Sequence, residues 1–309
     1  MTSRTKSLIV VAGPTATGKS ALALDLAARF GGTIINADAL QIYRDLRILT
    51  ARPDEASEAR APHRLYGVLD AAERGSVARW RELAEAEIEA AAVPILVGGT
   101  GLYLRALLSG LSAVPDIPAA IRAESGSLYR ELGGEEFRRR LAELDPEAAT
   151  HLPPGDRQRL TRAWEVVRAT GTPLSAWHRP APPAYRAATI LLMPPREALY
   201  AACDARFAAM AAGGGIAEAA ALAARGLSPD LPAMKAVGVP ELLRHLRGEI
   251  GLAEAIALGQ QATRRYAKRQ TTWFRHQVTA DLAFDEQFSE SLLRRSRHFI
   301  DGFLLTASG

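Results

Sequence analysis

The chain has 309 residues, of which 48% are hydrophobic and 23% are charged, a composition typical of a folded globular protein rather than a disordered or fibrous one. The single cysteine, Cys203, excludes an internal disulfide, and no group of Cys and His residues has zinc-ligand spacing. A formal net charge of +4 permits a polyanionic partner, although so small an excess is more often a solvated surface. No apolar run reaches the ~18 residues of a membrane span, so we expect a soluble, cytoplasmic protein without a membrane partner.

The N-terminal part predicts a strand, a glycine loop and a helix in direct succession. Leu8–Ala12 is a short apolar run, and Ala21–Phe30 has helix-forming composition with apolar residues at helical spacing. The apolar run leads into the glycine loop instead of a cleavage site, so we interpret it as a first strand and not as a signal peptide.

The loop between them has the sequence Gly13-Pro14-Thr15-Ala16-Thr17-Gly18-Lys19-Ser20, which matches the phosphate-binding pattern GxxxxGK[ST] in its required strand and helix context. Glycines let consecutive backbone N–H groups converge on phosphate oxygens, and the helix N-terminus adds partial positive charge. We expect Lys19 to reach the terminal phosphates and Ser20 to hold Mg²⁺. A glycine-rich turn without a ligand is the alternative, and the motif does not say which group leaves.

Two more apolar runs predict buried strands, at Thr33–Ala37 and Pro94–Val97, and the second follows an amphipathic helix at Val77–Ala91. Alternating strands and helices predict an α/β fold with a doubly wound parallel sheet of the P-loop NTPase type. Asp38 follows the first of these strands, at the carboxyl edge where open α/β sheets bind ligands, and is a candidate general base. A helix cap is the alternative role for this residue.

The second strand runs into Gly98-Gly99-Thr100-Gly101-Leu102-Tyr103. A nucleotide hydrolase usually has an acidic Mg²⁺ ligand at this place, whereas this chain has the hydroxyl of Thr100. The pattern argues against an ordinary ATPase, although a turn hydroxyl is the alternative interpretation of Thr100.

The rest of the chain is mainly helical. A strand-poor region rich in Arg and Glu predicts an inserted all-helical domain at 116–183, which a proline-rich loop at 171–183 closes. Ala188–Met193 returns as a strand, and helical patterns fill most of the C-terminal third. We therefore divide the chain into 1–115, the first part of the catalytic core, 116–183, the helical insertion, and 184–309, the completion of the core with C-terminal helices.

Besides the glycine loop, ordered blocks occur along nearly the whole chain: Asn-Ala-Asp-Ala-Leu-Gln-Ile-Tyr-Arg at 36–44, Thr-Ala-Arg-Pro at 50–53, Pro-His-Arg-Leu at 62–65, Val-Gly-Gly-Thr-Gly-Leu-Tyr at 97–103, Gln-Arg-Leu-Thr-Arg-Ala-Trp-Glu-Val at 158–166, Lys-Ala-Val-Gly at 235–238 and Thr-Arg-Arg-Tyr-Ala-Lys-Arg-Gln-Thr-Thr-Trp-Phe-Arg at 263–275. Together they closely resemble the bacterial tRNA dimethylallyltransferases. That family prenylates N6 of the adenine immediately 3′ of the anticodon (A37).

The resemblance implies a donor, dimethylallyl diphosphate, and roles for matching residues. Asp38 is expected to take a proton from the adenine amine, and Thr100 to hydrogen-bond the oxygen that bridges the dimethylallyl carbon and the diphosphate. The glycine-loop amides, Lys19 and Lys235 are expected to hold the diphosphate, with Mg²⁺ near Ser20. Fixed donors aimed at the leaving group stabilise the transition state more than the ground state.

The resemblance also implies tRNA-contacting positions, which are Asp38, Ala39, Leu40, Gln41, Thr100, Arg122, Gln158, Arg159, Leu160, Thr161, Arg162, Lys235, Ala236, Val237, Gly238, Val239, Pro240, Lys268, Arg269, Gln270, Thr271, Thr272, Trp273, Phe274 and Arg275. On a helix, Arg264, Lys268 and Arg275 share one face and Trp273 points away, which suits a phosphate-tracking stripe; alone, such a run is more often a solvated face. Since a stacked adenine must be extruded before it can react, we assign the insertion to capture of the tRNA anticodon stem-loop. The family favours a monomer without an obligate protein partner.

The chain departs from the family pattern at three places. Ala39 replaces a frequent serine, Leu49 stands where glycine is usual, and Val239-Pro240 replaces a pair that commonly contains tyrosine. None of these departures removes a proposed catalytic group, and they bear on base stacking and loop shape.

Three alternative functions remain open from the sequence. An adenylate isopentenyltransferase acting on free AMP does not need the insertion with its basic set Arg157, Arg159 and Arg162. A small-metabolite P-loop kinase would use Lys19 and Asp38 equally well but would consume ATP. A non-catalytic RNA-binding module leaves the glycine loop unexplained.

Overall fold

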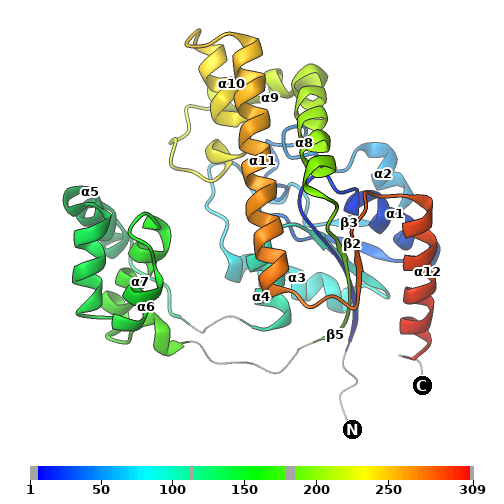
Figure 1. Ribbon diagram of the computed structural model, residues 1–309, viewed down its shortest axis with the longest axis horizontal. Coiled ribbons are helices and arrows are strands. Elements are labelled where there is room, and N and C mark those ends of the chain that lie inside the picture. The colour runs from blue at the N-terminus through cyan, green and yellow to red at the C-terminus, as the bar shows by residue number, and fades with distance from the viewer. Residues whose placement is uncertain (1–5, 111–113, 178–184, 307–309) are drawn as a thin grey trace. The chain divides into compact units, whose positions relative to one another are not determined.

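The computed structural model describes residues 6–110, 114–177 and 185–306, and the chain forms two compact units (Figure 1). The first comprises Met1–Leu108 together with Pro183–Gly309, and the second comprises Ser109–Pro182. The first unit contains the sheet and the glycine loop, and the second is helical. We describe each unit by itself.

A parallel sheet forms the centre of the first unit, with six strands among the described residues in the order β3-β2-β4-β1-β5-β6. The strands are β1 (Ser7–Ala12), β2 (Thr33–Asn36), β3 (His63–Arg64), β4 (Pro94–Gly98), β5 (Arg186–Leu192) and β6 (Leu282–Phe284). The predicted α/β class and parallel sheet are confirmed. Because β4 lies between β1 and β2, the carboxyl ends of these three strands are neighbours at one edge of the sheet.

Helices cover both faces of the sheet, which explains why its central strands are apolar along their whole length. In β1, Leu8 and Val10 pack into the core on one face, while Ile9 and Val11 pack into the core on the other. The second of these cores includes residues of α1 (Lys19–Phe30) and α12 (Glu290–Leu305), and the first includes residues of α3 (Val77–Ala90) and α4 (Gly101–Leu108). A short helix, α2 (Glu55–Arg60), precedes β3.

The C-terminal helices extend the first of these cores. They are α8 (Arg196–Met210), the π-helical turn η2 (Ala211–Gly215), α9 (Ile216–Ala224), the 3-10 turn η3 (Ala233–Lys235), α10 (Val239–Leu246) and α11 (Leu252–Gln277). The long helix α11 packs along α8 (Figure 1). Its buried positions recur every three or four residues, from Ala255 to Phe274, so one stripe of the helix faces the core. Strand β6 follows α11 and has only three residues, too few to show a period in the sequence.

The helical stretch 196–224 is long and apolar enough, by length and composition alone, to cross a membrane. Its middle is broken by the π-helical turn, where Gly213 and Gly214 leave helical geometry. Leu199, Cys203 and Phe207 are buried on one side of the stretch, within the first unit. These contacts are those of a helix pair in a protein core, and the predicted absence of a membrane partner stays a prediction.

The second unit has its own small core. It consists of α5 (Ala119–Ala142), α6 (Pro146–His151), α7 (Arg157–Thr170) and the 3-10 turn η1 (Leu174–Trp177), and its described residues, 114–177, contain no strand. Phe137, Leu141 and Leu160 are fully buried at its centre, and Trp164 packs against Phe137. The unit begins before the predicted boundary at residue 116. The predicted boundary at 183/184 and the loop prolines Pro180, Pro182 and Pro183 lie outside the described residues.

Candidate active site

The glycine loop turns between β1 and α1 in a conformation that depends on its glycines. Gly18 precedes α1 with φ of 83°, in the left-handed region that favours glycine. A Cβ on Gly13, where φ is 150°, would lie 2.5 Å from a carbonyl oxygen of β5. The Thr17 hydroxyl and the Lys19 ammonium both donate to the Pro14 carbonyl, at 3.0 and 2.9 Å, so the loop is closed on itself with Lys19 folded across it.

Asp38 and Thr100 meet because their strands are parallel neighbours. Asn36 pairs with Val97 in the register of β2 and β4, so the residues that follow leave the sheet side by side. The N–H of Ala39 donates to Thr100 Oγ1 at 2.9 Å, and the N–H of Thr100 donates to the Ala37 carbonyl at 3.2 Å. The structure therefore brings together the two residues that the sequence singled out at strand ends.

Asn36 fixes the position of Asp38. Its buried amide accepts from the Asp38 N–H at 2.8 Å and donates to the carbonyl oxygens of Asp38 and Leu65, both at 3.0 Å. Asp38 Oδ1 accepts from the Leu40 N–H at 2.9 Å, so the carboxylate closes a local turn and does not cap a helix.

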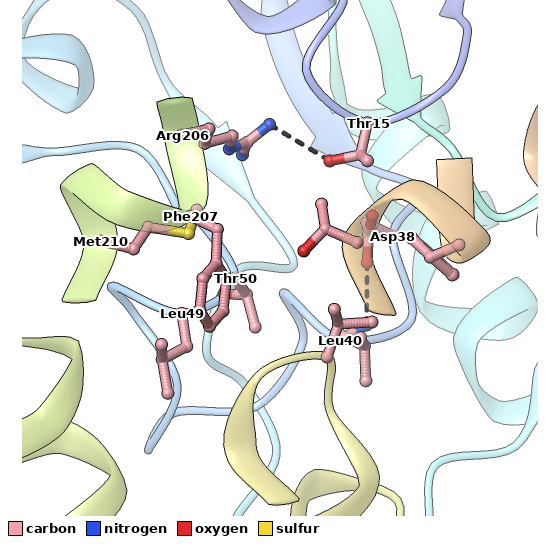
Figure 2. Close-up of a pocket in the computed structure, with 11 residues that line it drawn as sticks. Thr15, Asp38, Leu40, Leu49, Thr50, Arg206, Phe207 and Met210 are labelled. Atoms are coloured by element: carbon pink, nitrogen blue, oxygen red, sulfur yellow. Dashed lines mark hydrogen bonds between the residues drawn. The ribbon is translucent and has the colours of Figure 1, made fainter. Parts of the chain in front are cut away.

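Asp38 borders a pocket with one polar and one apolar end (Figure 2). The lining residues are Thr15, Asp38, Leu40, Leu49, Thr50, Arg206, Phe207, Met210, Val237, Thr263 and Tyr266. At the polar end, Arg206 Nη1 of α8 donates to Thr15 Oγ1 of the glycine loop at 3.2 Å. Figure 2 shows Leu49, Phe207 and Met210 grouped on the side of the pocket away from Asp38.

Burial and mutual repulsion disfavour the charges of two cations, Arg206 at the polar end of the pocket and Lys19 in the glycine loop. Burial lowers the pKa of Lys19 to about 8, and repulsion by Arg206 acts in the same direction, whereas the Asp38 carboxylate opposes them. Burial also lowers the pKa of Arg206, again opposed by Asp38. An anion bound beside these groups would relieve their repulsion and favour both charges, which is what a diphosphate site requires.

Tyr266 of α11 contributes a neutral hydroxyl to the same place. Burial, followed by the negative charge of Asp38, raises the pKa of this phenol well above its usual value, while a hydrogen bond with the Thr100 side chain acts in the opposite direction. Thr100 is thus hydrogen-bonded to both the Ala39 N–H and Tyr266. These bonds hold the Thr100 hydroxyl next to the pocket.

Lys235 is not brought to the pocket. Its side chain is 59% exposed and forms an ion pair with Asp230 at 2.9 Å, although Val237 from the same segment lines the pocket. Its role in holding the diphosphate stays a prediction.

Several residues that were predicted to contact tRNA are buried in the structure. The side chains of Leu160, Ala236, Val239 and Phe274 are fully buried, since they are the apolar residues that anchor their segments to the two cores. Gln270 is 6% exposed and bonds to the glycine loop and the Gly99 carbonyl. Gln270 thus supports the site from within the first unit, whereas Leu160 belongs to the core of the second. The contacts of these positions with tRNA stay a prediction.

The basic stripe on α11 differs in part from the prediction. Lys268, Arg269 and Arg275 are exposed, whereas Arg264 turns to an ion pair with Asp204 of α8. Trp273 lies away from this stripe, where a Cβ on Gly101 would meet its indole. In the second unit, Arg122, Gln158 and Arg159 are also exposed.

Arg206, Asn36 and Tyr266 are the site residues that the sequence analysis missed. Asn36 and Tyr266 lie inside blocks of the family pattern, but neither has chemistry that a spacing rule would single out. Arg206 does carry a signal, because it is the only basic residue between Arg196 and Arg225 in an alanine-rich stretch. A single basic residue within so long an alanine-rich stretch favours a buried functional role.

The donor set around the glycine loop fits Mg²⁺ that arrives with a phosphate ligand. Among the described residues no group of three or more His, Cys, Asp or Glu is placed to hold a metal, and Ser20 is exposed in the first turn of α1. Mg²⁺ keeps several waters and binds through few protein groups plus substrate phosphates. The single hydroxyl of Ser20 beside the phosphate-binding loop is consistent with this mode of Mg²⁺ binding.

Comparison with known proteins supports the same assignment. Residues 41–277 match the family described as IPP transferase. A tRNA dimethylallyltransferase of Rhodospirillum centenum is 57% identical over 289 residues, which cover 91% of this chain and 92% of the relative, and one of Rhodospirillum rubrum is 54% identical over 313 residues, covering 97% and 96%.

Solved structures agree with the sequence relatives. A tRNA isopentenylpyrophosphate transferase from Bacillus halodurans matches with a TM-score of 0.71 and 32% identity, covering 98% of each chain. A eukaryotic dimethylallyltransferase described as acting on tRNA matches with a TM-score of 0.75 and 26% identity, covering 87% of this chain and 70% of that one. The resemblance drawn from the motifs is therefore confirmed, and the chain belongs to the IPP transferase family of tRNA dimethylallyltransferases.

Proposed function

We propose that this chain transfers a dimethylallyl group from dimethylallyl diphosphate to N6 of the tRNA adenine 3′ of the anticodon, giving N6-isopentenyladenosine and diphosphate. The main support for this proposal is that the glycine loop, Asp38 and Thr100 lie together at one edge of the sheet, in a chain that is 57% identical to a tRNA dimethylallyltransferase. The kinase alternative accounts for the phosphate loop but not for the apolar end of the pocket.

The donors at the polar end would act on the leaving group. As the bond between the dimethylallyl carbon and the bridging oxygen breaks, the diphosphate leaves with the electron pair. The glycine-loop N–H groups, Lys19 and Arg206 lie where this negative charge grows, and the Thr100 hydroxyl is placed to hydrogen-bond the bridging oxygen. Donors that are already fixed cost no reorganisation during the reaction.

Asp38 would act on the nucleophile. The adenine N6 forms the new bond to carbon, and the proton that it loses passes to the Asp38 carboxylate. The bonds from Asn36 and to the Leu40 N–H keep this carboxylate at the pocket. An adenine in an anticodon loop reaches it only after it is turned out of its stack.

The apolar end of the pocket suits the five-carbon chain. Leu49, Phe207 and Met210 offer a surface that excludes water from a carbon centre that gains positive character as its bond to oxygen breaks. Leu49, which stands where the family usually has glycine, adds apolar volume at this end.

We assign tRNA binding to basic surfaces on each unit, described separately. On the first unit they are Lys268, Arg269 and Arg275 of α11, and on the second they are Arg122, Arg157 and Arg159. Exposed arginines and lysines of this kind track phosphates without reading sequence. Mg²⁺ held by Ser20 and the diphosphate would supply further positive charge to the leaving group. A monomer in the cytoplasm, without a membrane or an obligate protein partner, completes the proposal.

One experiment separates this function from its alternatives. The protein is incubated with dimethylallyl diphosphate and Mg²⁺, and with either unmodified tRNA or AMP, and prenylated adenosine is measured by mass spectrometry. We expect product on tRNA alone. Product on AMP alone would mean an adenylate isopentenyltransferase, while phosphate release from ATP without prenyl transfer would mean a kinase or an ATPase.

A further inference from the structure

The side-chain amide of Gln270 connects the two loops of the site. Its Oε1 accepts from the Thr15 N–H in the glycine loop at 2.8 Å, and its Nε2 donates to the Gly99 carbonyl at 2.9 Å. Gln270 is 6% exposed and lies in the last third of α11, far from both loops in sequence. Both polar atoms of one amide are thus used to tie one loop to the other.

The turn around Thr100 is shaped to receive this helix. A Cβ on Gly99 would lie 2.3 Å from Gln270 Nε2, and a Cβ on Gly101 would lie 2.2 Å from the Trp273 indole. Gln270 and Trp273 are three residues apart and therefore share a face of α11. The glycines on both sides of Thr100 let this helix face approach the turn.

A third contact comes from the same helix. Tyr266, one turn before Gln270, is hydrogen-bonded to the Thr100 side chain. The Thr100 N–H donates to the Ala37 carbonyl, and Gln270 holds the carbonyl of the same peptide unit, that of Gly99. Both polar groups of the peptide that leads into Thr100 are therefore fixed.

We propose that Gln270 is a positioning residue for prenyl transfer: it sets the distance between the glycine loop, which grips the diphosphate, and the Thr100 hydroxyl, which meets the bridging oxygen. This role rests on the proposed function. The loss of both bonds would let the two loops separate, and a displacement of ~1 Å costs about 10²-fold in rate. Since Gln270 is buried and both of its polar atoms bond to backbone groups of the two loops, we expect its effect to pass through Thr100.

A double-mutant cycle tests this dependence. Gln270→Ala is expected to lower kcat by about 10- to 100-fold, with tRNA affinity near that of the wild type. In a Thr100→Ala background, the same change is expected to have little further effect on kcat, because the hydroxyl that it positions is gone. Gln260→Ala is the matched control, since Gln260 lies on the same helix and its amide donates to the Asp204 carbonyl at 3.1 Å.

A second variant keeps the shape of the side chain. Glu in Gln270→Glu can accept from the Thr15 N–H, but only its protonated form can donate to the Gly99 carbonyl. Its kcat, divided by that of the wild type at each pH, is expected to rise as the pH falls, while the same ratio for Gln260→Glu stays flat.

Two results would overturn the proposal. One is a double variant whose loss of kcat equals the product of the losses in Gln270→Ala and Thr100→Ala. The other is a ratio of the kcat of Gln270→Glu to that of the wild type that does not change with pH. Failure of the proposed function is distinguishable, because the wild-type protein would then form no prenylated adenosine.

Discussion

Arg206 donates a hydrogen bond to the hydroxyl of Thr15, and so joins α8 to the glycine loop at the polar end of the pocket. The guanidinium is desolvated there, and burial lowers its pKa. A buried cation without a bound anion is costly. The protein retains this charge at a place where a diphosphate would compensate it.

Replacement of Arg206 by alanine should therefore impair the use of dimethylallyl diphosphate more than the binding of tRNA. We expect Arg206→Ala to lower kcat/KM for dimethylallyl diphosphate by roughly 10²- to 10³-fold, the usual cost of removing one fixed donor from a developing charge. Steady-state kinetics with saturating tRNA would measure this. Arg196→Ala, an exposed arginine on the same helix, serves as control, and equal losses in both variants would contradict a role at the leaving group.

Replacement of Asp38 tests the general base. Asp38→Asn can still accept from the Leu40 N–H, so the turn is kept while the base is lost. We expect turnover to fall by ~10²- to 10⁴-fold, with tRNA affinity, measured by filter binding, largely unchanged. The control is Asp285→Asn, because Asp285 also directly follows a strand of this sheet but is exposed and outside the lining of the pocket. Wild-type turnover of Asp38→Asn would remove the residue from the mechanism.

Sequence patterns predicted the strands and loops around the site, but they did not predict which distant helices contact these loops. The strands before Asp38 and Thr100 are buried on both faces, so their composition identified them, and parallel pairing then brought their ends together. Arg206 and Gln270 reach the loops from α8 and α11, and tertiary packing that brings together residues so far apart in sequence leaves no periodic signal. The family resemblance also placed the buried residues Leu160 and Phe274 among the tRNA-contacting positions, because a matched segment contains core residues as well as exposed ones.

The pKa of Lys19 predicts an alkaline limit on donor use. Burial and Arg206 lower this pKa to about 8, so the ammonium is charged below that pH and loses its proton above it. Since kcat/KM reports the free enzyme, we expect kcat/KM for the donor to fall as the pH rises through about 8. Lys19→Met should be less active at every pH, and its kcat/KM should not show this fall. A wild-type kcat/KM that stays constant to pH ~9.5, or the same fall in the variant, would contradict the assignment to Lys19.

Glu218 holds the loop that carries Leu49 and Thr50 into the pocket. Its carboxylate accepts from three successive N–H groups, those of Arg47 at 2.5 Å, Ile48 at 2.8 Å and Leu49 at 2.8 Å. Glycines make this approach possible, because a Cβ on Gly215 of the π-helical turn would lie 2.8 Å from a methyl of Leu49. Glu218 of α9 and the glycine break before it thus help to fix this loop, together with the bond from Thr50 Oγ1 to the Leu46 carbonyl.

Glu218→Gln keeps the size of the side chain but replaces one acceptor oxygen by an amide donor, which cannot accept a backbone N–H. A buried group left without its partner costs about 1–3 kcal/mol, so the free energy of unfolding in urea should fall by that amount. Because Leu49 and Thr50 line the pocket, the KM for the donor should rise while kcat changes less. Glu254→Gln, at an exposed position in the first turn of α11, should change neither. A loss of stability with an unchanged donor KM would mean that Glu218 supports the fold alone, and that the pocket wall at Leu49 is held by its apolar contacts.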